Sequence, residues 1–306
     1  MSRGPARSPL ENETTAGSLL VTLSYVSWGL LPLYWKLLAG VGSLEVLAHR
    51  VLWTVAFCLA ALLATRRKLA DILQAPMPRS RLLLAHLASG VLLSGNWLTY
   101  VYAVFVGRVV EASMGYYINP LLSVLLAVLV LGERLRPAQV AATALALAGV
   151  VVMSLSYGKV PWIAVSLALT FALYGLLKKR MPVDALRGLF LETTLVFPLA
   201  LAYVGFLSCR GQLGFAAGPA GRSILLAAAG PITGIPLVWF ASGARRIPLA
   251  RVGFLQYLSP TLQLLVGVLA FHEPFTATHA VSFGLIWAGV AVYLGSTIRW
   301  RRTRRT

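Results

Sequence analysis

The sequence predicts an all-α integral membrane protein with ten transmembrane helices arranged as two inverted five-helix repeats. Three observations support this fold class. First, 58% of the 306 residues are hydrophobic and only 12% are charged, whereas soluble domains carry about 25% charged residues. Second, ten apolar runs follow one another along the chain, and third, one segment recurs 140 positions later. This composition excludes a soluble enzyme, a disordered chain and, with only two cysteines, a disulfide-stabilised secreted domain.

The apolar runs have the length of membrane-crossing helices. A helix that crosses about 30 Å of hydrocarbon needs roughly 20 mainly apolar residues. The predicted spans cover residues 17–38, 44–64, 82–106, 111–131, 138–156, 160–177, 185–207, 223–243, 250–271 and 276–297. The expected domains are a disordered cytoplasmic tail (1–16), a first repeat (17–156), a second repeat (160–297) and a basic cytoplasmic tail (298–306).

The basic residues are distributed unevenly between the two sides of the membrane. With the N-terminus in the cytoplasm, twenty of the 27 Lys and Arg residues lie on the cytoplasmic side. Four lie on the opposite side: Arg108, Lys159, Arg210 and Arg222. The remaining three, which are Lys36, Arg50 and Arg187, lie within or at the ends of spans. This is the positive-inside pattern, so we expect both termini in the cytoplasm. The formal charge of +18 then reflects topology and anionic lipid headgroups, and we expect no nucleic-acid partner.

Residues 117–133 recur as residues 257–273. At a constant offset of 140, seven of the seventeen positions are identical, and they include more than common Leu and Val residues. The matched polar or helix-breaking pairs are Tyr117 and Tyr257, Pro120 and Pro260, and Glu133 and Glu273. These segments are the fourth and ninth spans, so the helices divide into five and five. Because five is odd, the second copy crosses the membrane in the opposite direction, as in secondary transporters that rock about a midplane site.

These features resemble a known family of membrane proteins. The two five-helix halves, with a Pro and a closing Glu in the fourth and ninth spans, are similar to the EamA repeats of the drug/metabolite transporter superfamily. Four stretches resemble its RarD-type permeases: WGLLPLYWK (28–36), EVLAHRVLW (45–53), EASMGYYINPLLSVLL (111–126) and GFLQYLSPTLQLLVGVL (253–269). The resemblance implies a bacterial inner-membrane permease that exports small metabolites, amino-acid-like compounds or drugs. It does not supply a substrate.

Polar side chains within the spans are the candidate site residues, because each is costly to place in hydrocarbon. Asn96 lies near the middle of the third span, and Tyr100 lies one turn further on the same face. The Asn96 amide can bind a substrate group, or it can donate an interhelical hydrogen bond. Tyr117, Gln256 and Tyr257 lie near mid-depth in the fourth and ninth spans. We expect these residues to line the substrate cavity.

The second span carries a further polar group. Glu45, His49 and Trp53 follow at intervals of four and share one face, whereas Arg50 points elsewhere. His49 can take up a proton near neutral pH. Arg50 can hold an anionic group in a bidentate fork, or it can extend back to the nearby interface. Glu192 in the seventh span is a second titratable group, so proton-coupled and facilitated transport both stay open.

The aromatic residues have two interpretations. Trp28 lies deep in the first span and can stack on an aromatic or cationic substrate, although plain packing is the alternative. Tyr34 and Trp35 near the end of that span are typical of the interfacial aromatic belt.

The repeated Pro and Glu residues predict structural features of the two halves. Pro120 and Pro260 are expected to kink or break their spans. Glu133 and Glu273 each end a span, where a carboxylate opposes the helix dipole. We therefore expect each carboxylate to have a partner and to act as a structural lock of its repeat.

A secondary transporter is the leading functional hypothesis. The alternatives are an intramembrane lipid-modifying enzyme with Glu192 or His49 as general base, and a non-transporting membrane subunit. The sequence has no GK[ST] phosphate loop and no HExxH or GxSxG motif, which argues against ATP-driven transport and common hydrolases. We expect no cofactor and no metal. The expected partners are a small-molecule substrate and the lipid bilayer, with a homodimer left open.

Overall fold

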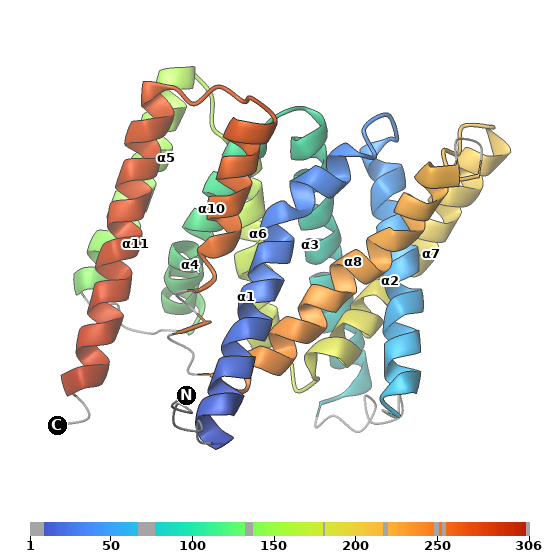
Figure 1. The fold of residues 1–306 in the computed structure, drawn as a ribbon, viewed down its shortest axis with the longest axis horizontal. Coiled ribbons are helices and arrows are strands. Elements are labelled where there is room, and N and C mark those ends of the chain that lie inside the picture. The colour runs from blue at the N-terminus through green and yellow to red at the C-terminus, as the bar shows by residue number, and fades with distance from the viewer. Residues whose placement is uncertain are drawn as a thin grey trace, which may run out of the picture.

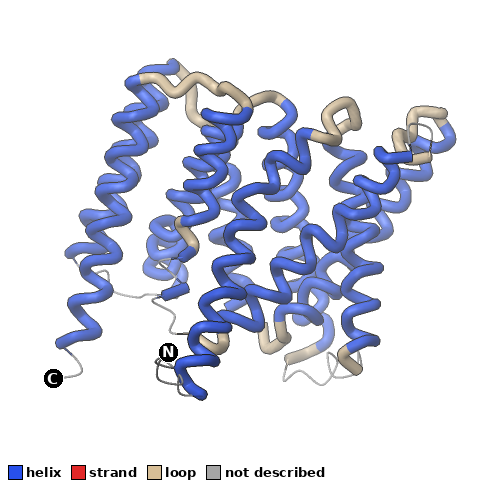
Figure 2. Tube along the Cα trace, in the orientation of Figure 1, coloured by secondary structure: helices blue, strands red, loops and turns tan. Residues whose placement is uncertain are grey.

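The computed structural model describes residues 9–66, 77–131, 137–179, 181–216, 220–247, 251–252 and 255–303. Nearly all of these residues are helical, and short loops join the helices (Figure 2). The first half of the chain forms α1 (Pro9–Lys36), α2 (Ser43–Ala64), α3 (Arg79–Phe105), α4 (Val109–Leu131) and α5 (Pro137–Tyr157). The second half forms α6 (Trp162–Lys179), α7 (Ala185–Cys209), α8 (Ala220–Ala244), α10 (Leu258–Leu265), the π-helix η2 (Val266–Ala270) and α11 (Ala277–Thr303).

Many of these helices have the length and composition of membrane spans. Among the described residues, six helices are long and apolar enough to cross a membrane: Glu13–Lys36, Ser43–Ala64, Arg79–Phe105, Pro137–Ser156, Ala185–Cys209 and Ala220–Ala244. Three shorter apolar helices follow the same pattern: Trp162–Lys178, Leu258–Ala270 and Ala277–Tyr293. The chain is therefore a multi-pass, all-helical membrane protein, as the composition predicts.

The start of the chain differs from the prediction. Helix α1 begins at Pro9, so residues 9–16, expected in a disordered tail, are helical. Proline suits the first position of a helix, where its missing N–H has no intrahelical partner to lose. Glu13 favours the same end through the helix dipole. Short-range helix signals therefore extend the first span beyond its apolar run.

The ninth predicted span, 250–271, is interrupted. In the described part of this segment, the chain turns at Gln256 and Tyr257 before α10 begins. Pro260 lacks a backbone N–H, and a proline ring in a helix clashes with the carbonyl four residues earlier, here that of Gln256. The expected interruption is therefore present just before Pro260, which lies in the first turn of α10, whereas α4 runs through Pro120 as one helix.

The helices form one bundle (Figure 1). Helices α5 and α11 pack together on the left side of this view, and α2, α7 and α8 pack together on the right side. Between these two groups lie α1, α3, α4, α6 and α10. The largest cluster of buried apolar residues joins α1, α2, α3, α4, α6 and α8. The start of α1 and the end of α11 lie on the same face of the bundle (Figure 1).

Candidate functional site

Arg50 is buried within the bundle. Only 4% of its surface is exposed, so it does not extend to the membrane interface. Its guanidinium carbon lies 4.0 Å from the ring centroid of Trp97 on α3 and 4.9 Å from that of Trp35 on α1. Its Nε donates a 2.9 Å hydrogen bond to the hydroxyl of Thr233 on α8. Helices from both halves of the chain thus meet around one cation.

Trp35 corrects one sequence-based expectation. This residue was expected in the interfacial belt, but its side chain is fully buried, with 0% exposed. The ring covers one face of the Arg50 guanidinium, and a desolvated cation–π contact of this kind is worth about 2 kcal/mol. The cation on α2 therefore accounts for a tryptophan that is buried near the end of its span.

Three tyrosines belong to or pack against the cluster of buried residues that contains Trp35: Tyr34 on α1, Tyr100 on α3 and Tyr116 on α4. The hydroxyl of Tyr34 donates a hydrogen bond to the backbone carbonyl of Leu225 on α8. Tyr100 meets Tyr116 edge to face, with ring centroids 5.7 Å apart. The Tyr100 hydroxyl is buried and has no hydrogen-bond partner among the described residues.

Asn96 connects these tyrosines to the second half of the chain. Its amide nitrogen donates to the carbonyl oxygen of Leu167 at 3.1 Å and to the hydroxyl of Thr170 at 3.0 Å, both on α6. Its amide oxygen accepts a 3.4 Å hydrogen bond from Tyr116. Of the two alternatives for Asn96, the structure contains the interhelical hydrogen bonds. We name the following residues the Arg50 cluster: Tyr34, Trp35, Arg50, Asn96, Trp97, Tyr100, Tyr116 and Thr233.

The shared face of Glu45, His49 and Trp53 is present and contacts the loop between α7 and α8. Glu45 accepts hydrogen bonds from the backbone N–H groups of Gly214 at 2.7 Å and Phe215 at 3.2 Å. The His49 ring stacks on Phe215 at 4.9 Å, and Trp53 lies 6.3 Å from the same ring. Neither His49 ring nitrogen has a hydrogen-bond partner in the part of the chain described.

Tyr117 and Tyr257 form a separate aromatic contact. Their rings stack with centroids 6.2 Å apart. The Tyr117 hydroxyl shares a 2.6 Å hydrogen bond with Thr261, and its ring meets Trp287 on α11. This residue therefore faces α10 and α11, away from the Arg50 cluster, because neighbouring residues on a helix point in directions about 100° apart. The structure thus places Tyr116, and not Tyr117, beside Asn96.

The two remaining predicted site residues lie apart from the Arg50 cluster. Trp28 packs against Tyr25 and Phe240, with centroid distances of 5.4 and 5.7 Å. Its backbone carbonyl accepts a 3.3 Å hydrogen bond from Gln263. Gln256 is half-buried at the turn before α10. Of the eight predicted residues, the structure therefore places Arg50, Asn96 and Tyr100 in the Arg50 cluster, and Tyr117 and Tyr257 in a separate contact with each other.

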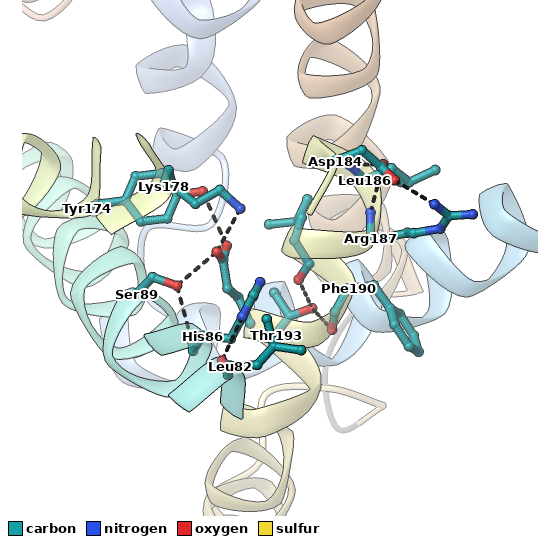
Figure 3. Close-up of polar contacts among 12 residues, drawn as sticks. Leu82, His86, Ser89, Tyr174, Lys178, Asp184, Leu186, Arg187, Phe190 and Thr193 are labelled. Carbon is teal, nitrogen blue, oxygen red and sulfur yellow. Dashed lines mark hydrogen bonds and ion pairs between the residues drawn. The ribbon is translucent and has the colours of Figure 1, made fainter. Parts of the chain in front are cut away.

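A second buried polar cluster contains Ser89, Tyr174 and Lys178 (Figure 3), and their common partner is Glu192. Its side chain is 0% exposed. It accepts hydrogen bonds from Lys178 at 2.8 Å, Ser89 at 2.8 Å and Tyr174 at 3.2 Å. These donors come from α3 and α6, so the carboxylate on α7 joins three helices. The nearby ring of His86 contacts the carbonyl oxygen of Leu82 at 2.9 Å.

Two carboxylates cap the starts of other helices. Glu273 accepts 2.7 Å hydrogen bonds from the backbone N–H groups of Val109 and Val110, at the start of α4. Glu111 accepts a 3.0 Å hydrogen bond from Ile163 at the start of α6 and pairs with Arg108. The expected partner of Glu273 is therefore a helix N-terminus, where a negative charge is favourable. Glu133, the matching residue of the first half, lies outside the described residues.

Two cavities open at opposite ends of the bundle, apart from the eight predicted residues. A groove of about 300 Å³ lies among the ends of α2 and α8 and the start of α7, and its lining includes Asp184, Arg245 and Arg246. A cavity of about 220 Å³ at the other end includes Arg108 and Glu273 in its lining. Both have charged rims.

The sequence contains few signals for the members of the Arg50 cluster that were not predicted as site residues. Tyr116 and Thr233 complete the Arg50 cluster, but one adjoins a more noticeable repeated tyrosine and the other is an uncharged hydroxyl residue. Trp97 directly follows Asn96 in the chain, which is the strongest available signal. The contacts themselves depend on which helices become neighbours.

Comparison with known proteins identifies the family. Residues 15–155 match the EamA-like transporter family. The chain is 44% identical to the protein RarD of Streptomyces exfoliatus, over 96% of this chain and 93% of that protein. It is 40% identical to the uncharacterized transporter YojE of Bacillus subtilis (strain 168), over 96% of this chain and 98% of that protein. RarD of Escherichia coli (strain K12) is 36% identical over 95% of this chain and 97% of that protein.

A solved structure gives independent evidence of the fold. One crystal structure, 24% identical in sequence, aligns over 90% of this chain and 96% of its own chain, with a TM-score of 0.59. That likeness concerns the fold alone, whereas the sequence relatives extend over almost the full length. The chain therefore belongs to the EamA-like transporter family and, within it, to the RarD-type permeases.

Proposed function

We propose that this permease is a secondary transporter of the bacterial inner membrane that exports small organic solutes by alternating access. The observation that carries the proposal is the Arg50 cluster. It places a buried cation and several polar side chains where helices of the two halves of the chain meet. Ionisable groups within a membrane are expensive and mark substrate pathways. The relatives named as transporters support the same class of function.

The helix contacts support two inverted repeats as the basis of the mechanism. If α1 to α5 correspond in order to α6, α7, α8, the ninth span and α11, each contact should recur with its partners exchanged. The contacts of α1 with α8 and of α3 with α6 are such a pair. So are α2 with α8 and α3 with α7, and also α1 with α10 and α4 with α6. Three further contacts join two corresponding helices, namely α2 with α7, α4 with α10 and α5 with α11. Exchanging the partners leaves each of these contacts unchanged.

Close helix approaches follow the same exchange. A Cβ atom at Gly90 on α3 would lie 2.6 Å from the backbone oxygen of Glu192 on α7. A Cβ atom at Gly230 on α8 would clash with the backbone of Trp53 on α2. Small residues let membrane helices approach closely, and here both halves use one glycine for the equivalent contact. This supports a common design for the two halves.

The polar contacts favour transport over intramembrane catalysis. A general base needs a free lone pair within reach of its substrate. The Glu192 carboxylate already accepts hydrogen bonds from three side chains, which occupy most of its lone pairs. The transport proposal requires no such base. Proton coupling through Glu192 or His49 is part of the proposed function. Measuring solute flux with and without a pH difference across the membrane tests it.

The proposed orientation places both chain ends in the cytoplasm. Supporting this, the start of α1 and the end of α11 lie on one face of the bundle (Figure 1). That face also includes the groove bordered by Arg245 and Arg246. Basic residues gather in cytoplasmic loops. The 300 Å³ groove would then open to the cytoplasm.

Solute flux from liposomes tests the proposed function. Purified protein is reconstituted into liposomes loaded with chloramphenicol, amino acids, organic acids and nucleosides, and the released solutes are measured by mass spectrometry. Chloramphenicol is included because one relative is named a chloramphenicol-sensitive protein. We expect at least one solute to leave faster than from protein-free liposomes. Equal release of every solute would contradict transport.

A reversible crosslink tests alternating access. A Cβ at Gly267 on η2 would lie 3.1 Å from Cγ2 of Val110 on α4, which is compatible with a disulfide between cysteines at these positions. In a background with Cys58 and Cys209 replaced, the crosslink would join the two halves at one end of the bundle. We expect oxidation to stop flux and a reductant to restore it. Undiminished flux through the crosslinked protein would contradict a rocking mechanism.

A further inference from the structure

We propose that Arg50 binds the carboxylate of a small monoanionic organic substrate, and that the other side chains of the Arg50 cluster hold the uncharged part of the molecule. This inference rests on the proposed transport function and specifies the class of its substrate. It is carried by the geometry of the guanidinium, by the absence of a counter-charge among the residues that the structure describes, and by the surrounding aromatic side chains.

The guanidinium has only its edge available for hydrogen bonding. Trp97 and Trp35 lie over the guanidinium at 4.0 and 4.9 Å. Along the edge, Nε is used by Thr233. The Nη1 atom is buried and has no hydrogen-bond partner among the residues described. Arginine presents its donors as a planar fork that matches a carboxylate, so an in-plane approach to this edge is the interaction that the geometry favours.

No carboxylate of the described chain neutralises Arg50. The four buried carboxylates of that part of the chain all have other partners. They are Glu45 with backbone N–H groups, Glu111 with Arg108, Glu192 with Lys178, and Glu273 with the start of α4. An unpaired charge in a low-dielectric interior is strongly unfavourable. A substrate anion would provide the missing counter-charge, and the resulting interaction would be strong because it is desolvated.

The neighbouring hydroxyl groups fit the second carboxylate oxygen. Tyr100 is 3% exposed, belongs to the same cluster of buried residues as Trp35, and has an unpartnered hydroxyl within the described structure. A phenol can donate to a carboxylate oxygen while the guanidinium donates to the other. Two unpartnered donors of different helices, α2 and α3, would then hold one anionic group. This would also satisfy two buried polar atoms that otherwise lack partners.

The composition of the Arg50 cluster restricts the ligand further. Arg50 is its only cationic member, so a singly charged carboxylate is matched better than a phosphate dianion, which would leave one charge uncompensated. Three tyrosines and two tryptophans provide apolar ring surface with hydroxyl groups at the edges. Such a lining favours a compact organic body over a highly charged or hydrophilic one. The substrate class is therefore a small organic monocarboxylate.

Glu192 provides a built-in comparison. Arg50 follows the N-cap residue Gly42 of α2 by eight positions, and Glu192 follows the N-cap residue Asp184 of α7 by the same number. Both charges are buried and both contact a hydroxyl group of a neighbouring helix. Glu192 is neutralised by Lys178 at 2.8 Å, so its position has no need of a ligand. A Glu192 variant is therefore the control for changing a buried charge outside the proposed binding site.

Binding of matched acids and amides tests the inference. The probes are benzoate, pyruvate and butyrate, each beside its amide, and binding is measured by the thermal stability of the purified permease. A ligand that binds the folded state raises this stability by mass action. We expect at least one acid to stabilise the wild-type protein, and its amide to bind at least about tenfold more weakly, because the amide lacks the charge-assisted interaction. Equal effects of acid and amide, or no stabilisation by any acid, would overturn the inference.

Variants of Arg50 assign the preference to this side chain. We expect Arg50→Gln to abolish the preference for acid over amide, and Arg50→Lys to weaken acid binding by about tenfold because it keeps the charge without the planar fork. Glu192→Gln should lower basal stability but preserve the preference. A preference that survives in Arg50→Gln would overturn the inference. If Arg50→Gln fails to fold, the Arg50→Lys variant and the comparison of acid and amide binding by the wild-type protein still test the inference.

Flux of an uncharged solute separates this inference from the proposed function. Chloramphenicol is neutral and needs no counter-charge. If Arg50→Gln and wild type release it equally while acids and amides bind alike, the permease function stands and the carboxylate site is wrong. If wild type releases no solute at all, the proposed function itself is wrong.

Discussion

Arg50 and Glu192 occupy the same position in α2 and α7, at equal distances from the N-caps of these helices. Each is hydrogen-bonded to hydroxyl groups of adjacent helices, Arg50 to Thr233 and Glu192 to Ser89 and Tyr174. They differ in charge compensation. Lys178 pairs with Glu192, whereas no carboxylate of the described chain pairs with Arg50. Lys178 therefore supplies the counter-charge of Glu192, whereas the proposed substrate carboxylate would supply that of Arg50.

Replacing Glu192 with Gln should destabilise the protein. Lys178 would lose its counter-charge, although Ser89 would keep an acceptor. Lys178 is 21% exposed and water can solvate it in part, so we expect a loss of about 1–3 kcal/mol in the free energy of unfolding, the range for an unsatisfied buried polar group. Unfolding in mixed micelles by a denaturing detergent would measure the change.

The matched control for this prediction removes both charges. Glu192→Gln combined with Lys178→Met should recover part of the lost stability, because a buried pair costs more when one partner is left alone. A double variant no more stable than Glu192→Gln would contradict the assigned ion pair.

Asn96→Ala should have a measurable but small effect on stability. The substitution removes the hydrogen bonds to Leu167 and Thr170, and one interhelical hydrogen bond in a membrane protein is worth about 0.6 kcal/mol on average. Thr170→Val removes one of the two acceptors and should cost less. Both variants should reach the membrane in normal amounts, as measured by in-gel fluorescence of a reporter fusion. Loss of Asn96→Ala from the membrane would show a larger structural role than these contacts indicate.

Tyr117→Phe and Tyr257→Phe form a matched pair. Both substitutions keep the stacked rings, but only the first removes a hydrogen bond, the 2.6 Å contact with Thr261. We expect Tyr117→Phe to lower the free energy of unfolding by about 0.5–1.5 kcal/mol and Tyr257→Phe to leave it nearly unchanged. Thermal unfolding of the purified variants would measure both. The opposite order of stabilities would contradict the described contacts.

Glu273→Ala should destabilise the start of α4. The carboxylate accepts hydrogen bonds from Val109 and Val110, and loss of a helix cap typically costs about 1 kcal/mol. Glu273→Gln keeps one acceptor oxygen and should lose less stability. Amide hydrogen exchange at Val109 and Val110 would become faster in Glu273→Ala, with little change at Ile163, which Glu111 caps. Unchanged exchange at Val109 would show that the cap is not needed.

Reporter fusions would test the proposed orientation. The positive-inside pattern predicts that fusions after Lys179 and Thr306 report the cytoplasm, and that a fusion after Gly214 reports the opposite side. An alkaline phosphatase and a fluorescent protein, which are active on opposite sides of the inner membrane, give paired readouts at each position. A C-terminus outside the cytoplasm would contradict both the orientation and the even number of spans.

Several features of this protein depend on the sequence alone. The apolar runs determine the membrane class and the approximate helix bounds, because backbone groups in lipid must be satisfied within helices. Pro260 favours the interruption of the ninth span, because its ring acts locally on the carbonyl of Gln256, although α4 continues through the matching Pro120. The common face of Glu45, His49 and Trp53 also follows from helical periodicity.

The tertiary structure decides which polar side chains meet. Helical periodicity separates Tyr116 from Tyr117, but it does not say that the first faces Asn96 and the second faces Thr261. Trp35 is buried because Arg50 from another helix lies against its ring, and Glu273 finds its partner 163 to 164 positions away. In a chain whose helices are apolar on most sides, the hydrophobic pattern distinguishes lipid-facing from buried surfaces only weakly. Helix neighbours, and with them the site, are set by close packing and by a few interhelical polar contacts.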